Sequence, residues 1–159
     1  LLFTVSFGAA AQDEHQHGYA QLNIVIEGSV IEMELVSPSV NILGFEHEVS
    51  TEQEQRILQK AQHILLSKEE PLFVEISLES AESDELLEEE GHNHVHDLEE
   101  HNDIHLHYVY SCKQPAKLAG MKTQLFNKFT SLDELDVQVL TAEKQISKHL
   151  DKQHSELDF

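Results

Sequence analysis

The sequence is poor in positive charge. It contains ten Lys and Arg against thirty Asp and Glu, which gives a formal net charge of −20 at pH 7. Such a charge repels nucleic-acid phosphates and anionic lipid surfaces, and it concentrates cations near the protein. The composition therefore favours a metal ion or a cationic partner over DNA, RNA or a membrane.

Cysteine is also scarce, because Cys112 is the one cysteine in the sequence. One thiol cannot form an intramolecular disulfide, and it excludes the zinc-finger and zinc-ribbon motifs, which need several cysteines at fixed spacing. We expect Cys112 to be a buried free thiol. Any zinc must then be bound by histidine and carboxylate. Long apolar runs are missing too, because after residue 11 no segment approaches the length of a membrane-spanning helix.

The first eleven residues, LLFTVSFGAAA, resemble the end of a secretory signal peptide. An apolar run leads to Ala9 and Ala11, which fit an A-x-A cleavage site before Gln12. The positively charged start of such a peptide is missing, so we expect a chain that is truncated at its beginning. A buried strand or a short apolar tail is the alternative. The pattern predicts a periplasmic protein, exported across the inner membrane of a Gram-negative bacterium.

Residues 12–159 are predicted to form a single α+β domain, because 40 % apolar residues allow one modest core. We expect an antiparallel sheet of about six strands with two packed helices, in the order ββαβ, acidic His-rich loop, βαββ. Period-two alternation predicts strands around residues 22–26, 30–37, 72–80 and 104–112, and two short strands around a turn near Ala142.

Two helices complete this prediction. Thr51 and Glu54 have the spacing of a capping box, and apolar residues recur at helical spacing over residues 52–67. Pro115 suits the first turn of a second helix, whose apolar face would extend to Phe129.

Histidines cluster between Glu88 and His107, a stretch that holds six of the twelve. Most of it belongs to an acidic segment, residues 81–103, which lacks Lys and Arg and is predicted to be a mobile loop. Neutral imidazole is the commonest protein ligand for borderline transition metals. The candidate metal ligands of this loop are His92, His94, His96 and His101. A solvated acidic linker without metal is the alternative.

Further histidines occur as pairs two residues apart. His105 and His107 lie on one face of a predicted strand, with Cα atoms about 6.6 Å apart, which lets both rings reach one ion. The alternative is that His105 and His107 are a solvent-facing pair on an edge strand and bind no metal. His15 and His17 repeat this spacing at the start of the first strand. We expect three other histidines to be surface residues: His63, His149 and His154.

Several segments together resemble the ZrgA family of zinc-regulated periplasmic proteins. These are HQHG at residues 15–18, AQLNIVIEG at 20–28, ELVSPSVNILGFEH at 34–47 and the stretch 108–129, with GFEH the most specific. The resemblance implies zinc binding in the periplasm in the service of a zinc import system. The ligands that it implies are His15, His17, His47, His105 and His107.

The resemblance also implies that the first strand lies close to residues 104–112. Four imidazoles would then surround one ion, with His47 or Glu46 as an alternative ligand. Family members often have a second cysteine before the third strand, where this chain has Leu72 and Phe73, so a disulfide is not expected.

The predicted function is a non-catalytic protein that captures one or more zinc ions and buffers them or delivers them to an inner-membrane zinc importer. The alternative of a zinc hydrolase needs three fixed protein ligands, an open position for water and a general base. Glu46 is the one candidate for the base. Nickel or copper handling also remains open, since histidine sites bind both tightly, although the two methionines do not form the Met-rich motif typical of copper(I). A further alternative is an adaptor whose acidic loop binds a cationic partner without metal.

Overall fold

A hairpin of two nine-residue strands forms the centre of the fold, β1 (Tyr19–Glu27) and β2 (Val30–Pro38). The turn between them contains Gly28, whose φ of 59° is a conformation that favours glycine. Their buried side chains alternate with exposed ones, as the sequence predicts. The computed structural model describes residues 17–77, 87–89, 94–96 and 103–159, so residues 1–11, assigned to the signal peptide, lie outside it.

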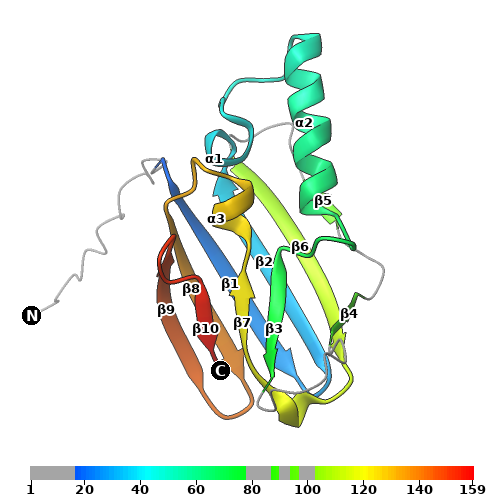
Figure 1. The fold of residues 1–159 in the computed structure, drawn as a ribbon, viewed down its shortest axis with the longest axis vertical. Helices are drawn as coiled ribbons and strands as arrows, with labels where there is room; N and C mark the ends of the chain where they lie inside the picture. The colour runs from blue at the N-terminus through cyan, green and yellow to red at the C-terminus, as the bar shows by residue number, and fades with distance from the viewer. Residues whose placement is uncertain (1–16, 78–86, 90–93, 97–102) are drawn as a thin grey trace, which may run out of the picture.

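This hairpin belongs to a seven-stranded sheet in the order β4-β6-β2-β1-β8-β9, in which β5 also pairs with β6. Neighbouring strands are antiparallel except for β1 and β8, which are parallel. The other members of the sheet are β4 (Leu87–Glu89), β5 (His94–His96), β6 (Asp103–Cys112), β8 (Glu134–Thr141) and β9 (Gln145–Asp151). Figure 1 shows their arrangement.

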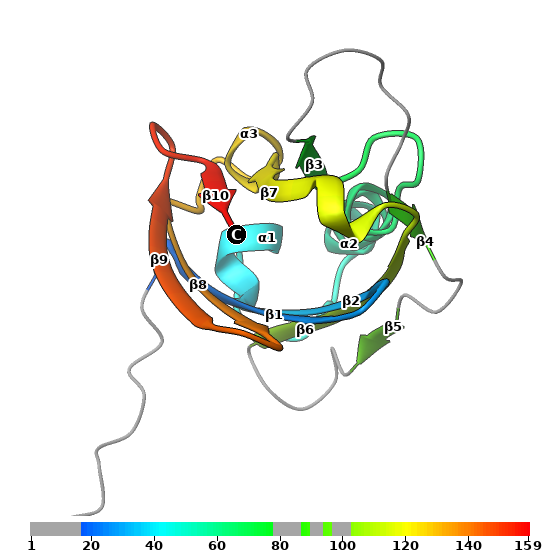
Figure 2. The same cartoon turned by 90° about the horizontal axis from the view of Figure 1, so that it is seen from below.

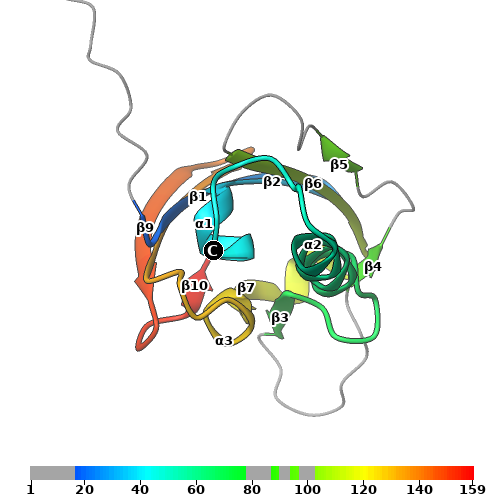
Figure 3. The same ribbon diagram turned by 90° about the horizontal axis from the view of Figure 1, so that it is seen from above.

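A smaller sheet and the helices fill the concave side of the large sheet. The small sheet has the order β10-β7-β3, with β3 (Phe73–Ser77), β7 (Leu118–Thr123) and β10 (Glu156–Asp158). The helices are α1 (Ser39–Leu43), α2 (Glu52–Leu65), α3 (Leu125–Lys128) and a 3₁₀ turn, η1 (Pro115–Lys117). Figures 2 and 3 show the large sheet curving around these elements, which leaves its convex face uncovered by them.

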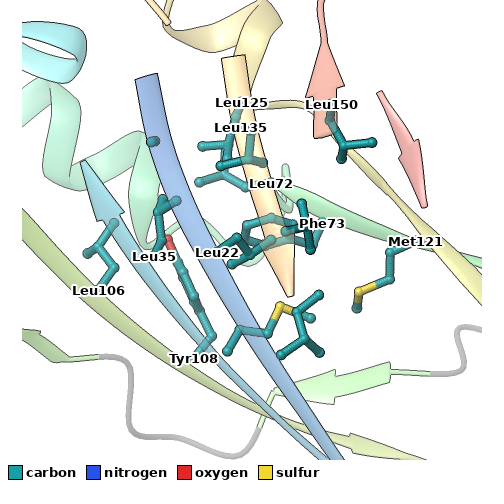
Figure 4. Packing of buried hydrophobic residues seen from close by; sticks show 14 of the residues in the cluster. Leu22, Leu35, Leu72, Phe73, Leu106, Tyr108, Met121, Leu125, Leu135 and Leu150 are labelled. Atoms are coloured by element: carbon teal, nitrogen blue, oxygen red, sulfur yellow. The ribbon is translucent and has the colours of Figure 1, made fainter. Parts of the chain in front are cut away.

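The hydrophobic core lies between the two sheets and under α2. Figure 4 shows residues of both sheets in one buried cluster, Leu22, Leu35, Leu106 and Tyr108 from the large sheet and Phe73 and Met121 from the small one. The Tyr108 hydroxyl donates a 3.0 Å hydrogen bond to the carbonyl of Leu65, which ties β6 to the end of α2. None of the helices that the structure describes is long and apolar enough to cross a membrane.

The predicted α+β fold, an antiparallel sheet of about six strands with two packed helices, is wrong. The described part of the chain is mostly β, with ten strands in two sheets, and one strand pair is parallel. The prediction failed because the order of elements along the chain contains no information on which strands pair. The C-terminal segment contributes a further strand, β10, which pairs with β7.

The second predicted helix is the main local error. Residues 115–129 form η1, β7 and the single turn α3 instead of one helix from Pro115 to Phe129. Gly120 lies so close to β10 that a Cβ atom there would be 2.1 Å from the carbonyl oxygen of Leu157. Pairing with β3 and β10 satisfies the backbone of β7 on both sides, and these distant contacts outweigh the helical spacing of its apolar residues.

Other predicted elements are confirmed. The helix begins at Glu52 and ends at Leu65, and both hydrogen bonds of the Thr51 and Glu54 capping box are present. The predicted strand over residues 104–112 is β6, and the last two predicted strands are β8 and β9. The strand predicted over 72–80 begins at Phe73, and its residues beyond Ser77 are outside the described ranges. Within the acidic segment 81–103, the described residues form β4, β5 and the start of β6.

Candidate metal centre

His105 and His107 are half-buried on the outer face of β6. Their neighbours Ile104, Leu106 and Tyr108 point into the core, where each is no more than 2 % exposed. Because side chains alternate along a strand, burial of this apolar set fixes both histidines on the opposite face. The predicted shared face of the pair is confirmed, and the core holds it on a ten-residue strand.

β5 brings two more histidines to this strand. Its register with β6 places His94 opposite His107 and His96 opposite His105. Opposite Cα atoms in an antiparallel pair are about 4.5–5.5 Å apart. The backbone positions of these four residues therefore form a two-by-two block at the rim of the large sheet, where β5 lies beside β6 (Figures 2 and 3).

β2 flanks the block with two carboxylates that the sequence analysis missed. Glu34 lies directly opposite His107 in the register, whereas His105 has Val36 opposite. Glu32 is the next outward-facing residue of β2, and its Oε2 atom lies 3.8 Å from His107 Nε2. The available signal was their alternation with buried Met33, which places both glutamates on the outer face of a predicted strand.

The other predicted histidines are not gathered at this block. β2 lies between β1 and β6, and His17 contacts Glu46, with Nε2 and Oε1 3.0 Å apart. That carboxylate oxygen is buried and accepts no well-oriented hydrogen bond within the described residues. His47 contacts Glu54, with 3.1 Å between Nε2 and Oε1. The structure thus forms two separate histidine–carboxylate pairs, and His15, His92 and His101 lie outside the described ranges.

The outer face of the large sheet has no basic side chain in the described part of the chain. The outward positions of β1, β2, β6, β8 and β9 are neutral, acidic or histidine, whereas Lys148 of β9 points inward and pairs with Asp158 of β10. With no Lys or Arg to offset them, the carboxylates make this face a region of negative potential. Free cations are therefore attracted to the face that carries the histidine block.

The far side of the same face carries a Tyr–Asp–His chain. Asp136 Oδ1 lies 2.7 Å from His149 Nδ1, and Asp136 Oδ2 accepts a 2.8 Å hydrogen bond from the Tyr19 hydroxyl. The contact with His149 and then that with Tyr19 lower the pKa of Asp136, and Asp136 raises the pKa of His149. Burial first, and then the bond to Asp136, raise the pKa of Tyr19. His149 is exposed, as predicted, but it has a specific partner.

This chain is well separated from the histidine block. His105, Val36, Gln21, Asp136 and His149 occupy one cross-strand row, each opposite the next. Four strand spacings of about 4.8 Å place β6 and β9 roughly 19 Å apart along this row. The two features therefore cannot bind the same ion.

Within the described residues, no group of three or more His, Cys, Asp or Glu is arranged to hold a metal ion. For β5 the structure describes the backbone, so the block is defined by register and by the side chains of β6 and β2. Its donors, imidazole and carboxylate, are those that zinc accepts in cysteine-free sites. Cys112 is a free thiol, 2 % exposed, on the core side of β6, and its predicted burial is confirmed.

The chain belongs to the ZrgA family of zinc uptake proteins, whose family model matches residues 14–159. The resemblance drawn from the sequence motifs is thereby confirmed. No curated protein matches the chain. The family is one of zinc uptake proteins and not an enzyme family, so the chain is a zinc uptake-related protein.

Proposed function

We propose that this ZrgA-family protein captures zinc in the periplasm through its histidine clusters and buffers it or delivers it to a zinc importer of the inner membrane. The observation that carries the proposal is the register of β5 on β6, which pairs His94 with His107 and His96 with His105. Zinc prefers four ligands in a tetrahedral arrangement, and imidazole is one of its commonest donors. One strand pair can thus supply a complete ligand set.

The position of the block suits an ion that must enter and leave. It lies at the rim of the sheet, and His105 and His107 are only half-buried. β5 has three residues, a length that contributes little pairing energy by itself. An ion bound between β5 and β6 is thus held by a short strand at an edge, which a partner protein can approach.

Ligand chemistry also favours exchange over permanent storage. Cysteine thiolates hold structural zinc tightly, and the one cysteine of this chain is buried on the opposite face of β6. Imidazole binds zinc in its neutral form, so protons compete with the ion and binding weakens as the pH falls. The acidic outer face raises the local concentration of zinc without fixing it in one place.

The remaining histidines are proposed as auxiliary ligands. His92 and His101 flank β5 in the sequence and would deliver ions to the block. Just before β1, His17 with Glu46 forms a second contact point for zinc, together with His15. His47 with Glu54 forms a third. Each of these offers fewer donors than the block, so we expect weaker binding there.

The test is a calorimetric zinc titration of the protein at neutral pH beside the double variant His105→Ala/His107→Ala. We expect one tight ion and several weaker ones in the unchanged protein, and loss of the tight ion in the variant. The matched control is His63→Ala/His154→Ala, which also removes two imidazoles, both of them exposed and neither at the block. Equal tight binding by all three proteins would contradict the proposal.

A further inference from the structure

We infer that Glu32 of β2 is a zinc ligand, so that the centre is a mixed site of imidazole and carboxylate that spans β5, β6 and β2. This inference rests on the proposed zinc-binding function of the block. It adds a residue that no sequence motif identifies, and it adds a carboxylate to the four histidines proposed for the block.

The distance between Glu32 and His107 sets this pair apart. Four other histidine–carboxylate pairs in the described part of the chain have nitrogen and oxygen 2.7–3.1 Å apart, a direct hydrogen-bond distance. Between His107 Nε2 and Glu32 Oε2 the distance is 3.8 Å, which is too long for a hydrogen bond. The two groups are therefore neighbours that do not form a direct hydrogen bond.

A zinc ion fits this separation. With ligand bonds of about 2.0–2.2 Å and a tetrahedral angle, two ligand atoms on one zinc lie roughly 3.4 Å apart. The observed 3.8 Å needs a change of only a few tenths of an ångström. Such a shift is within reach, because the side chains of His107 and Glu32 are 43 % and 57 % exposed and therefore not locked by packing.

The backbone holds the two side chains on a common face. β2 and β6 pair without interruption from Val30 to Pro38, and Glu32 is diagonal to His107 in that register. Buried Met33 and Ile31 on either side of Glu32 fix its outward direction. His105 has Val36 opposite instead of an acid. The observed contact between an imidazole and a carboxylate at the block is at its His107 end.

The charges around Glu32 favour an external cation. The outward positions of the described strands of the large sheet contain no Lys or Arg, so no fixed cation there competes for its carboxylate. Glu34, opposite His107, adds a second negative charge to the same corner. A divalent ion between Glu32 and His107 would be bound by both side chains and attracted by the negative charge of Glu34.

The decisive experiment compares Glu32→Gln with Glu27→Gln, a matched control at the exposed end of β1. Zinc affinity is measured by competition with a chromophoric chelator, and the ligand field is measured from the visible spectrum with one equivalent of Co²⁺. We expect Glu32→Gln to weaken zinc binding by about tenfold or more and to change the cobalt spectrum. Glu27→Gln should match the unchanged protein in both.

Three results would overturn the assignment. Glu32→Gln could bind zinc like the unchanged protein while His105→Ala/His107→Ala loses the tight ion, which would leave the proposed function intact. Glu34→Gln could show the loss in place of Glu32→Gln. A weaker affinity with an unchanged cobalt spectrum would show that Glu32 acts through its charge and is not a ligand. If the double histidine variant keeps the tight ion, the proposed function of the block fails first.

Discussion

Asp136 Oδ1 lies 2.7 Å from His149 Nδ1, and this contact joins the outer faces of β8 and β9 at one edge of the large sheet. Asp136 also accepts the Tyr19 hydroxyl from β1, so one carboxylate connects three neighbouring strands. Both contacts favour the ionised carboxylate, and the contact with His149 favours the imidazolium. The stability of this edge should consequently depend on pH.

The first prediction concerns His149→Asn. The folded pKa of His149 is raised, so its contribution is full below the unfolded value of about 6.5 and is lost as the pH rises through the folded pKa. The folded pKa of Asp136 is lowered, so its contribution is present above about 3.9 and is lost as the pH falls through the lowered value. The stability loss in the variant should be largest between about pH 4 and 6.5.

Urea unfolding from pH 4.5 to 9, with a chelator present, measures this dependence. Ser147→Asn is the control, because it places the same new side chain on the same face of β9 without removing a titratable group. A stability difference between His149→Asn and the unchanged protein that is constant across this range would contradict the prediction.

The second prediction concerns Gly120→Ala. The new methyl group would lie 2.1 Å from the carbonyl oxygen of Leu157, so β10 must shift away from β7. We expect a loss of about 1–3 kcal/mol in the free energy of unfolding. Truncation after Ser155 removes β10 and supplies the control, because in the truncated chain Gly120→Ala should cost much less. An equal cost in both chains would show that the strain lies elsewhere.

The third prediction concerns Thr51→Ala at the start of α2. The Thr51 hydroxyl accepts a 3.2 Å hydrogen bond from the Glu54 amide, so its removal leaves that amide without its cap. We expect a loss of about 1 kcal/mol in thermal or urea unfolding. Thr51→Ser keeps the hydroxyl and should lose much less. Equal effects of the two substitutions would mean that the methyl group, and not the cap, matters.

The fourth prediction concerns removal of the acidic segment from Glu88 to Glu100. The fold should survive, because β6 keeps its full register with β2 and its core face. The number of zinc ions per chain, counted by native mass spectrometry, should fall, since this segment contains His92, His94 and His96. In the unchanged protein, zinc should also be released as the pH falls toward about 6, where protons compete for imidazole. An unchanged ion count in the shortened chain would contradict capture by this segment.

Much of the candidate site could be read from the sequence. The spacing of His105 and His107 within an alternating segment placed both on the outer face, because burial of Leu106 and its apolar neighbours leaves no other choice. The pairing of His94 and His96 with β6 could not be predicted from the sequence. They stand in a segment whose composition predicts a loop, and strand pairing depends on register, which local composition does not encode.

The sequence by itself determined the chemistry of this protein: imidazole and carboxylate donors, a strongly negative charge, and one thiol that burial removes from metal binding. Period-two alternation and the capping box also determined most strands and α2, because these are local properties of the chain. The tertiary structure alone decided which strands meet. It placed β2 between β1 and β6, separated His17 from His107, and brought Glu32 to the histidine block. Such contacts join residues distant in sequence, and their free energy comes from packing and pairing that no local pattern contains.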